Sequence, residues 1–131
     1  MMRYLVSAVA VLLASINTAG AATPDEACAA LGEARTHLVA MIGSTDKAAQ
    51  DDLKSKVHAA SAKLDAALAG MSGADADKAT QFKPVWEAFK NTRETEIIPA
   101  VYAGRNADAK AIATGIQAER MKAMKGAMGC K

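Results

Sequence analysis

Apolar residues recur at spacings of three and four along most of the chain after residue 22, which is the period of an α-helix with one buried face. Turns that contain glycine divide this pattern into four stretches. We therefore expect four helices, at about residues 24–42, 46–69, 74–103 and 107–128. Because helices joined by short turns pack antiparallel, the pattern predicts an all-α fold, an up-down-up-down four-helix bundle over residues 23–131.

Several helix ends carry recognisable signals. Thr23, Pro24 and Glu26 match a capping box with proline at the first helical position, so the first helix should begin there. Gly104 is well placed to end the third helix, and Asn106 to cap the fourth.

Two prolines, Pro84 and Pro99, fall inside the third apolar pattern. Each lacks an amide donor and crowds the preceding turn. We expect the helix to bend near each of them rather than to end.

The fourth helix has two neighbouring apolar lines. The first runs through Ala109, Ile112, Ile116, Glu119, Ala123 and Ala127. The second runs through Gln117, Met121, Met124 and Met128. Helical spacing makes the methionines core residues, and the first line brings a carboxylate, Glu119, toward the core.

A ligand-binding site is predicted around Arg93, which follows Phe82, Trp86 and Phe89 at core spacing. If the last two helices fold back near Gly104, position 93 lies opposite about 116, and position 119 opposite about 90. A buried charge needs a partner, so one interpretation is an Arg93–Glu119 ion pair that fixes the register of the bundle.

The sharper interpretation is that Arg93 binds a carboxylate ligand in a pocket walled by Trp86 and Phe89, with Glu119 nearby. A third is that both charges lie on solvated faces. On the second interpretation, Arg93→Ala should abolish any stabilisation of the protein by carboxylates.

Residues 1–22 match a secretory signal peptide. Arg3 supplies the positive start, Tyr4–Ile16 is an apolar run interrupted by Ser7, and Ala19–Ala21 is a small-residue cleavage site. The alternative is an uncleaved membrane anchor, but the run is short for a span of about 20 residues. We expect a periplasmic or secreted protein with no stable membrane span after cleavage.

The chain has two cysteines, Cys28 and Cys130, near the two ends of the predicted mature protein. An even pair in an oxidising compartment predicts a disulfide, and an up-down-up-down bundle brings its first and last turns together. Two free thiols are the alternative.

Charge and motifs exclude several function classes. Without Arg3 the chain has 15 basic and 14 acidic side chains, interspersed, so a nucleic-acid partner is not expected. His37 and His58 are offset by more than a turn, which is poor for a shared metal. The sequence contains no catalytic motif, so we expect no enzyme, no cofactor and no metal site.

Part of the chain resembles a known family. The run WEAFKNTRETEIIPA (86–100), Gly104, and the run NADAKAIATGIQAERMKAM (106–124) look like the second half of the four-helix-bundle sensor domain of methyl-accepting chemotaxis receptors. The resemblance implies an exported bundle, a possible homodimer along the first or fourth helix, and a small molecule bound between helices. No second membrane helix or signalling coiled coil follows, which favours a stand-alone binding role.

The sequence thus predicts an exported, non-catalytic four-helix-bundle protein that binds a small, anionic ligand or a partner protein. The alternative is a periplasmic haem or metal carrier like the exported four-helix cytochromes. Those carry C-x-x-C-H or a histidine in the last helix, and this chain has neither. A structural protein without a ligand is a third possibility.

Overall fold

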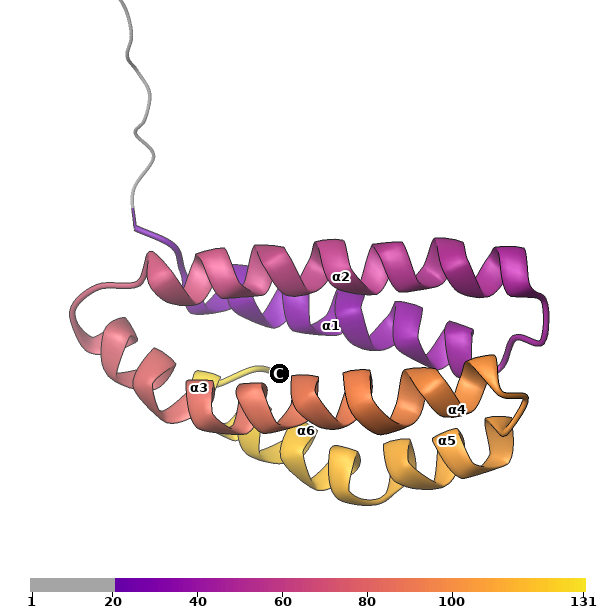
Figure 1. Cartoon of the computed structure of the whole chain (residues 1–131). Coiled ribbons are helices and arrows are strands. Elements are labelled where there is room, and N and C mark those ends of the chain that lie inside the picture. The colour runs from indigo at the N-terminus through magenta and orange to yellow at the C-terminus, as the bar shows by residue number, and fades with distance from the viewer. Residues whose placement is uncertain (1–20) are drawn as a thin grey trace, which may run out of the picture.

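The computed structural model describes residues 21–131, so the predicted signal peptide lies outside the described residues except for Ala21 and Ala22. Every regular element in this range is helical, as Figure 1 shows. The elements are α1 (Pro24–Ile42), α2 (Lys47–Ala69), α3 (Ala74–Thr92), η2 (Arg93–Ile97), α4 (Ile98–Tyr102), α5 (Asn106–Thr114) and α6 (Ile116–Met128). The all-α class is confirmed.

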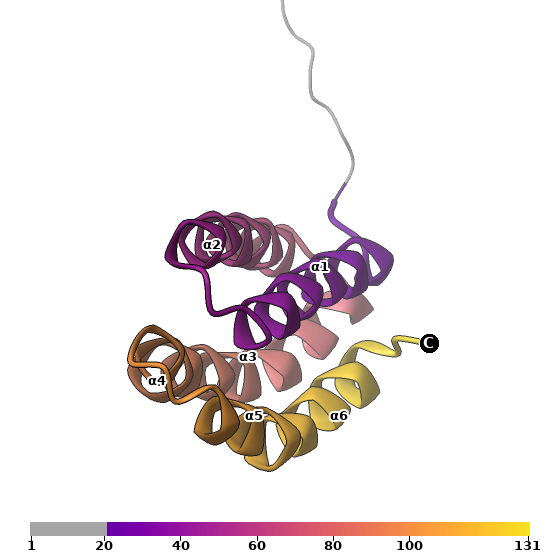
Figure 2. The same ribbon diagram turned by 90° about the vertical axis from the view of Figure 1, so that its right-hand side faces the viewer.

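The helices form four antiparallel arms, as predicted. The first two arms are α1 and α2, the third is α3 continued by η2 and α4, and the fourth is α5 followed by α6 (Figures 1 and 2). The closest packing is between α1 and α2 and between α3 and α6. The bundle is therefore built from two helical hairpins that face each other.

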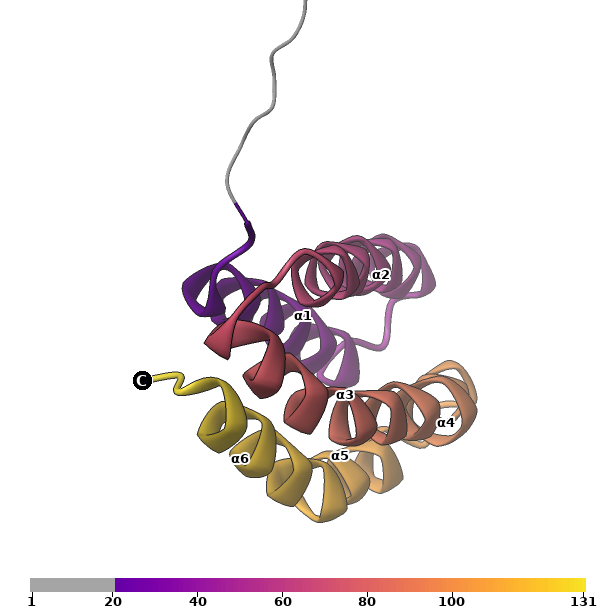
Figure 3. The same cartoon turned by 90° about the vertical axis from the view of Figure 1, so that its left-hand side faces the viewer.

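The predicted disulfide between Cys28 and Cys130 is present, with 5.6 Å between the two Cα atoms. It joins the first turns of α1 to the residues after α6, at the end of the bundle that Figure 3 shows. At the opposite end, the Asn106 amide donates hydrogen bonds to the carbonyls of Ile42 and Ser44 at 2.7 and 2.8 Å. Both ends of the bundle are thus tied across the two hairpins.

The helix-end signals were mostly read correctly. Thr23 and Glu26 form the predicted capping box, and Gly104 follows the third arm at φ +78°, a conformation that favours glycine. The prediction that Asn106 caps the fourth arm is wrong, because Arg105 occupies that position and Asn106 bonds across to the first turn instead.

The third arm contains a π-helical turn, η2, just before Pro99. The amide of Ile98 donates to the carbonyl of Arg93, five residues back. A regular turn would press the Pro99 ring against the carbonyl four residues earlier, and the wider π turn relieves that clash. The bend expected at Pro99 therefore takes the form of an extra residue, and Thr92 and Arg93 are both buried.

The fourth arm is broken at Gly115, where a continuous helix was predicted. Gly115 has ψ −110°, far from a helical value, and a Cβ added there would lie 3.0 Å from the carbonyl oxygen of Ala111. The break rotates α6 relative to α5. Of the two lines proposed for this arm, Gln117, Met124 and Met128 are buried, whereas Ile116 is 51% exposed and Glu119 is exposed.

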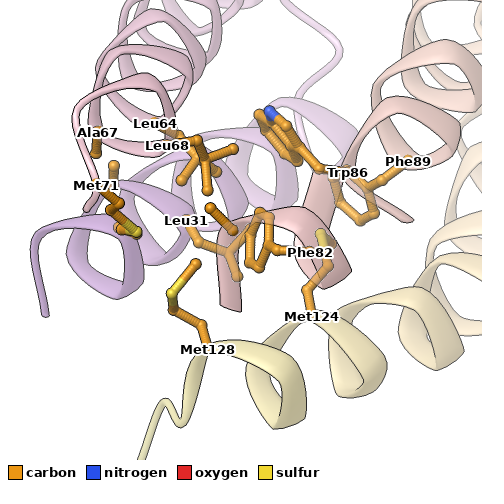
Figure 4. Close-up of a cluster of buried hydrophobic side chains, with 13 residues drawn as sticks. Leu31, Leu64, Ala67, Leu68, Met71, Phe82, Trp86, Phe89, Met124 and Met128 are labelled. Carbon is orange, nitrogen blue, oxygen red and sulfur yellow. The ribbon is translucent and has the colours of Figure 1, made fainter. Parts of the chain in front are cut away.

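Two apolar clusters fill the bundle. The one near the disulfide, shown in Figure 4, packs Phe82, Trp86 and Phe89 against Leu31, Leu64, Met124 and Met128. The other, near the Gly104 turn, is formed mainly by Leu38, Met41, Val57, Ile97 and Val101. Burial of each such side chain contributes about 1.5–3 kcal/mol.

Candidate functional site

Trp86 and Phe89, two of the predicted ligand residues, are core residues. Trp86 has no exposed surface and stacks on Phe89 with 5.8 Å between ring centroids. Its indole Nε1 donates a 2.7 Å hydrogen bond to the Asp65 carboxylate on α2. Lys90 bonds the same carboxylate and lies 5.2 Å from the centre of the indole ring.

Lys90 is held as a cation by this arrangement. Partial burial lowers the pKa of its ammonium group, but the hydrogen bonds to Glu87 and Asp65 outweigh that effect and leave the pKa above its ordinary value. The Trp86 edge of the third arm is thereby fastened to α2.

Arg93, the predicted anion anchor, is 3% exposed. Its Nη1 donates to the Ser61 hydroxyl at 2.7 Å, and its Nε donates to the Glu94 carboxylate at 2.7 Å. Both partners belong to the bundle itself. Arg93 therefore satisfies the rule that a buried charge is paired, and its role in ligand binding stays a prediction.

The predicted approach of Glu119 to Arg93 is wrong. The register of the last two arms is close to the one expected, since the Gln117 amide donates to the Phe89 carbonyl at 2.9 Å. The rotation after Gly115, however, turns Arg120 rather than Glu119 toward the third arm, where its Nη1 donates to the Thr92 hydroxyl at 2.8 Å. Glu119 faces solvent.

Together these groups form a polar layer between the two apolar clusters, defined by Ser61, Thr92, Arg93 and Gln117, all buried. Each of these side chains has a hydrogen-bond partner in the bundle. A fully paired polar layer fits best in one register, so it fixes how the two hairpins align. This agrees with the first interpretation of Arg93, with Glu94 in place of Glu119.

The polar layer reaches the surface through Glu94, whose second oxygen lies 2.9 Å from His58 Nε2. Partial burial raises the pKa of the Glu94 carboxyl, but hydrogen bonds and charges from Arg93 and His58 outweigh it, and the pKa lies below its ordinary value of 4.5.

This shift predicts how stability depends on pH. Because the folded-state pKa of Glu94 is lower than the unfolded one, ionised Glu94 stabilises the fold above pH 4.5, and that contribution is lost as the pH falls through the folded-state pKa. In urea unfolding between pH 7 and pH 3, Glu94→Gln should lose less stability on acidification than the wild type. Glu96→Gln, an exposed neighbour with the same change of charge, should lose as much as the wild type. Parallel wild-type and Glu94→Gln curves would contradict the prediction.

A separate groove of about 710 Å³ lies between α1 and the α5–α6 arm. Its volume falls within the range of about 300–1,000 Å³ typical of ligand sites. The groove exists because small residues, Gly32, Ala113 and Ala118, line it where α1 and α6 face each other; a Cβ added at Gly32 would meet nothing within 4 Å.

The floor of the groove is apolar. Leu31, Leu38, Ile42 and Phe89 are buried beneath it, and Met121 is half-buried. Phe89 is thus the one predicted ligand residue that lines the groove, whereas Trp86 and Arg93 lie behind it in the core.

The rim of the groove is basic. Arg35 from α1, Lys122 and Lys125 from α6, and Lys131 line it, and its lining contains no acidic side chain. Within residues 21–131, none of these four basic groups takes part in an ion pair. The positive charge of the rim is therefore available to an anion.

Sequence reasoning missed this rim. Arg35, Lys122 and Lys125 lie on the solvent side of their helices, and solvent-facing basic residues are ordinary on a bundle. The available signal was the Cys28–Cys130 pair, since a disulfide there brings residues near 32–35 opposite residues near 122–125.

Metal-binding residues and membrane spans were also searched. Over the described range, no three His, Cys, Asp or Glu side chains are grouped to hold a metal ion. None of the helices between residues 21 and 131 combines the length and apolarity needed to cross a bilayer.

Comparisons with known proteins give no identification. No model of a protein family matches the chain, and neither the curated proteins nor the solved structures include a significant match.

Proposed function

We propose that this chain is an exported, non-catalytic binding protein, similar in role to a chemoreceptor sensor domain, that holds a small anionic molecule in the groove between α1 and α6. The observation that carries the proposal is the groove's rim of unpaired basic side chains over an apolar floor, with no acid in the lining. Such a surface attracts anions and offers apolar area to whatever they carry.

Export is supported by the disulfide, because such bonds persist in oxidising compartments. A non-catalytic role is supported by the chemistry of the groove lining, whose lysine, arginine, threonine and glutamine side chains favour binding over proton transfer or nucleophilic attack.

The test is a comparison of melting temperatures in phosphate, succinate, octanoate and octyl phosphate, with sodium chloride at matched ionic strength as reference. A bound anion stabilises the native state by mass action, about 2.7 kcal/mol at 100 times its dissociation constant. At least one anion should raise the melting temperature of the wild type, and Lys122→Gln/Lys125→Gln should reduce that rise.

The matched control is Lys83→Gln/Lys110→Gln, which removes the same charge from exposed positions outside the groove. This control should respond like the wild type. If no anion stabilises the protein, or if both double variants respond equally, the groove is not an anion site. If only Arg93→Met abolishes the response, the site lies at Arg93 as the sequence first predicted.

A further inference from the structure

The groove is polarised along its length, and this points to a more specific ligand than a small anion. The inference rests on the proposed function. Because α1 and α6 run antiparallel from the disulfide, counting along both helices places Lys122 and Lys125 level with the turn of α1 that contains Arg35. The basic groups thus share one part of the groove.

Beyond Arg35 the lining becomes apolar. Leu38, Val39 and Ile42 follow on α1, and Ala113 faces them from α5. From Arg35 to Ile42 the helix advances seven residues, about 10 Å. This stretch is long enough for a medium-length alkyl chain but too short for a long one.

Val39 gives a second, independent observation. It is 53% exposed and is one of two large apolar side chains of the described chain that are left so open to solvent. It lies in the apolar part of the groove, where a bound alkyl chain would cover it. A small hydrophilic anion such as phosphate would leave Val39 in water.

We propose that the groove binds a free medium-chain carboxylate, with its head between Arg35, Lys122 and Lys125 and its alkyl chain over Leu38, Val39 and Ile42. The carboxylate gains charge-assisted hydrogen bonds from the rim. The chain removes apolar surface from water, which drives association in proportion to the area buried.

The experiment measures dissociation constants by calorimetry for butanoate, hexanoate, octanoate, decanoate and hexadecanoate, each below its micelle concentration. Full burial of a methylene is worth about fourfold in affinity, and an open groove gives about twofold. Affinity should therefore rise about two- to fourfold per methylene up to octanoate or decanoate and then level off. Octan-1-ol, which has no charge, should bind at least tenfold more weakly than octanoate.

Ala113→Phe fills the apolar end of the groove and should remove the gain from hexanoate to decanoate while leaving butanoate binding unchanged. Ala111→Phe adds the same ring to an exposed position of α5 outside the groove, and should behave like the wild type. An Ala113→Phe variant that keeps the chain-length gain would overturn the proposal even if its fold and butanoate affinity are intact.

Other outcomes separate this inference from the proposed function. Phosphate or succinate that binds as tightly as octanoate, with no dependence on chain length, refutes the alkyl site but leaves the anion site standing. Absence of binding by every anion refutes both. Co-sedimentation with phosphatidylglycerol vesicles without binding of free carboxylates would assign the groove to a lipid surface and overturn the proposal.

Discussion

Replacing both cysteines, Cys28→Ser/Cys130→Ser, should lower the free energy of unfolding by about 4 kcal/mol. The bond spans 102 residues of sequence, almost all of the described chain, and loop closure of that length restricts the unfolded state by about 4.7 kcal/mol in the chain-entropy model. Total stabilities of about 5–15 kcal/mol make this a large fraction. Urea unfolding at pH 7 measures the change.

The disulfide is also the covalent link between α1 and the end of α6, two arms that otherwise contact each other little. Its loss should therefore widen the disulfide end of the groove and weaken any ligand held there. Reductant should destabilise the wild type to the same extent and leave the double variant unchanged. A double variant within about 1 kcal/mol of the oxidised wild type would mean that packing alone holds these ends together.

Trp86→Ala should cost about 3–5 kcal/mol, because it leaves a cavity beside Phe82 and Phe89 in the larger apolar cluster. It also removes the donor to a carboxylate that receives hydrogen bonds from the third arm. Trp86→Phe should cost less, about 2 kcal/mol, since the ring contacts remain and the indole hydrogen bond to a charged group is lost. Circular dichroism must follow unfolding, because Trp86 is the only tryptophan.

A double-mutant cycle isolates the hydrogen bond. Trp86→Phe and Asp65→Ala, alone and together, should show a coupling energy of about 1 kcal/mol or more, as expected for groups in direct contact. Additive losses would show that the 2.7 Å contact contributes no net stability. A cost below 1 kcal/mol for Trp86→Ala would contradict the tight packing of this cluster.

Much of the fold could be predicted because it depends on local signals. The capping box at Thr23 and Glu26 and the apolar line through Phe82, Trp86 and Phe89 are properties of neighbouring residues. The disulfide followed from one geometric argument, that an even number of antiparallel passes returns the chain to its starting end. These features need no knowledge of tertiary contacts.

The errors have a common physical cause. Helical periodicity assumes a constant rotation per residue, and this chain departs from it twice, at η2 and at Gly115. Gly115 was read as part of a continuous helix, and its unusual ψ shifted the inward face from Ile116 and Glu119 to Gln117 and Arg120. One changed dihedral thereby exchanged an acid for a base beside the third arm.

The candidate site was harder to predict than the fold. The sequence drew attention to Arg93 because a charge on an apolar line is unusual, and the structure explains that charge by Ser61 and Glu94. The basic groove had no such signal, because its residues come from the first and last arms and each is unremarkable alone. A site assembled from ordinary surface residues becomes visible only when the arms are placed side by side.

The π turn has a consequence for how the third arm joins its neighbours. A regular helix directs one residue per turn toward a given side, so at one level it can serve one adjoining arm well. Because η2 accommodates a surplus residue, the consecutive side chains Thr92 and Arg93 diverge, the first meeting Arg120 on α6 and the second meeting Ser61 on α2. Shortening this turn by one residue would force the arm to choose between those two attachments, so the extra residue lets a single helix bridge both hairpins at the same height.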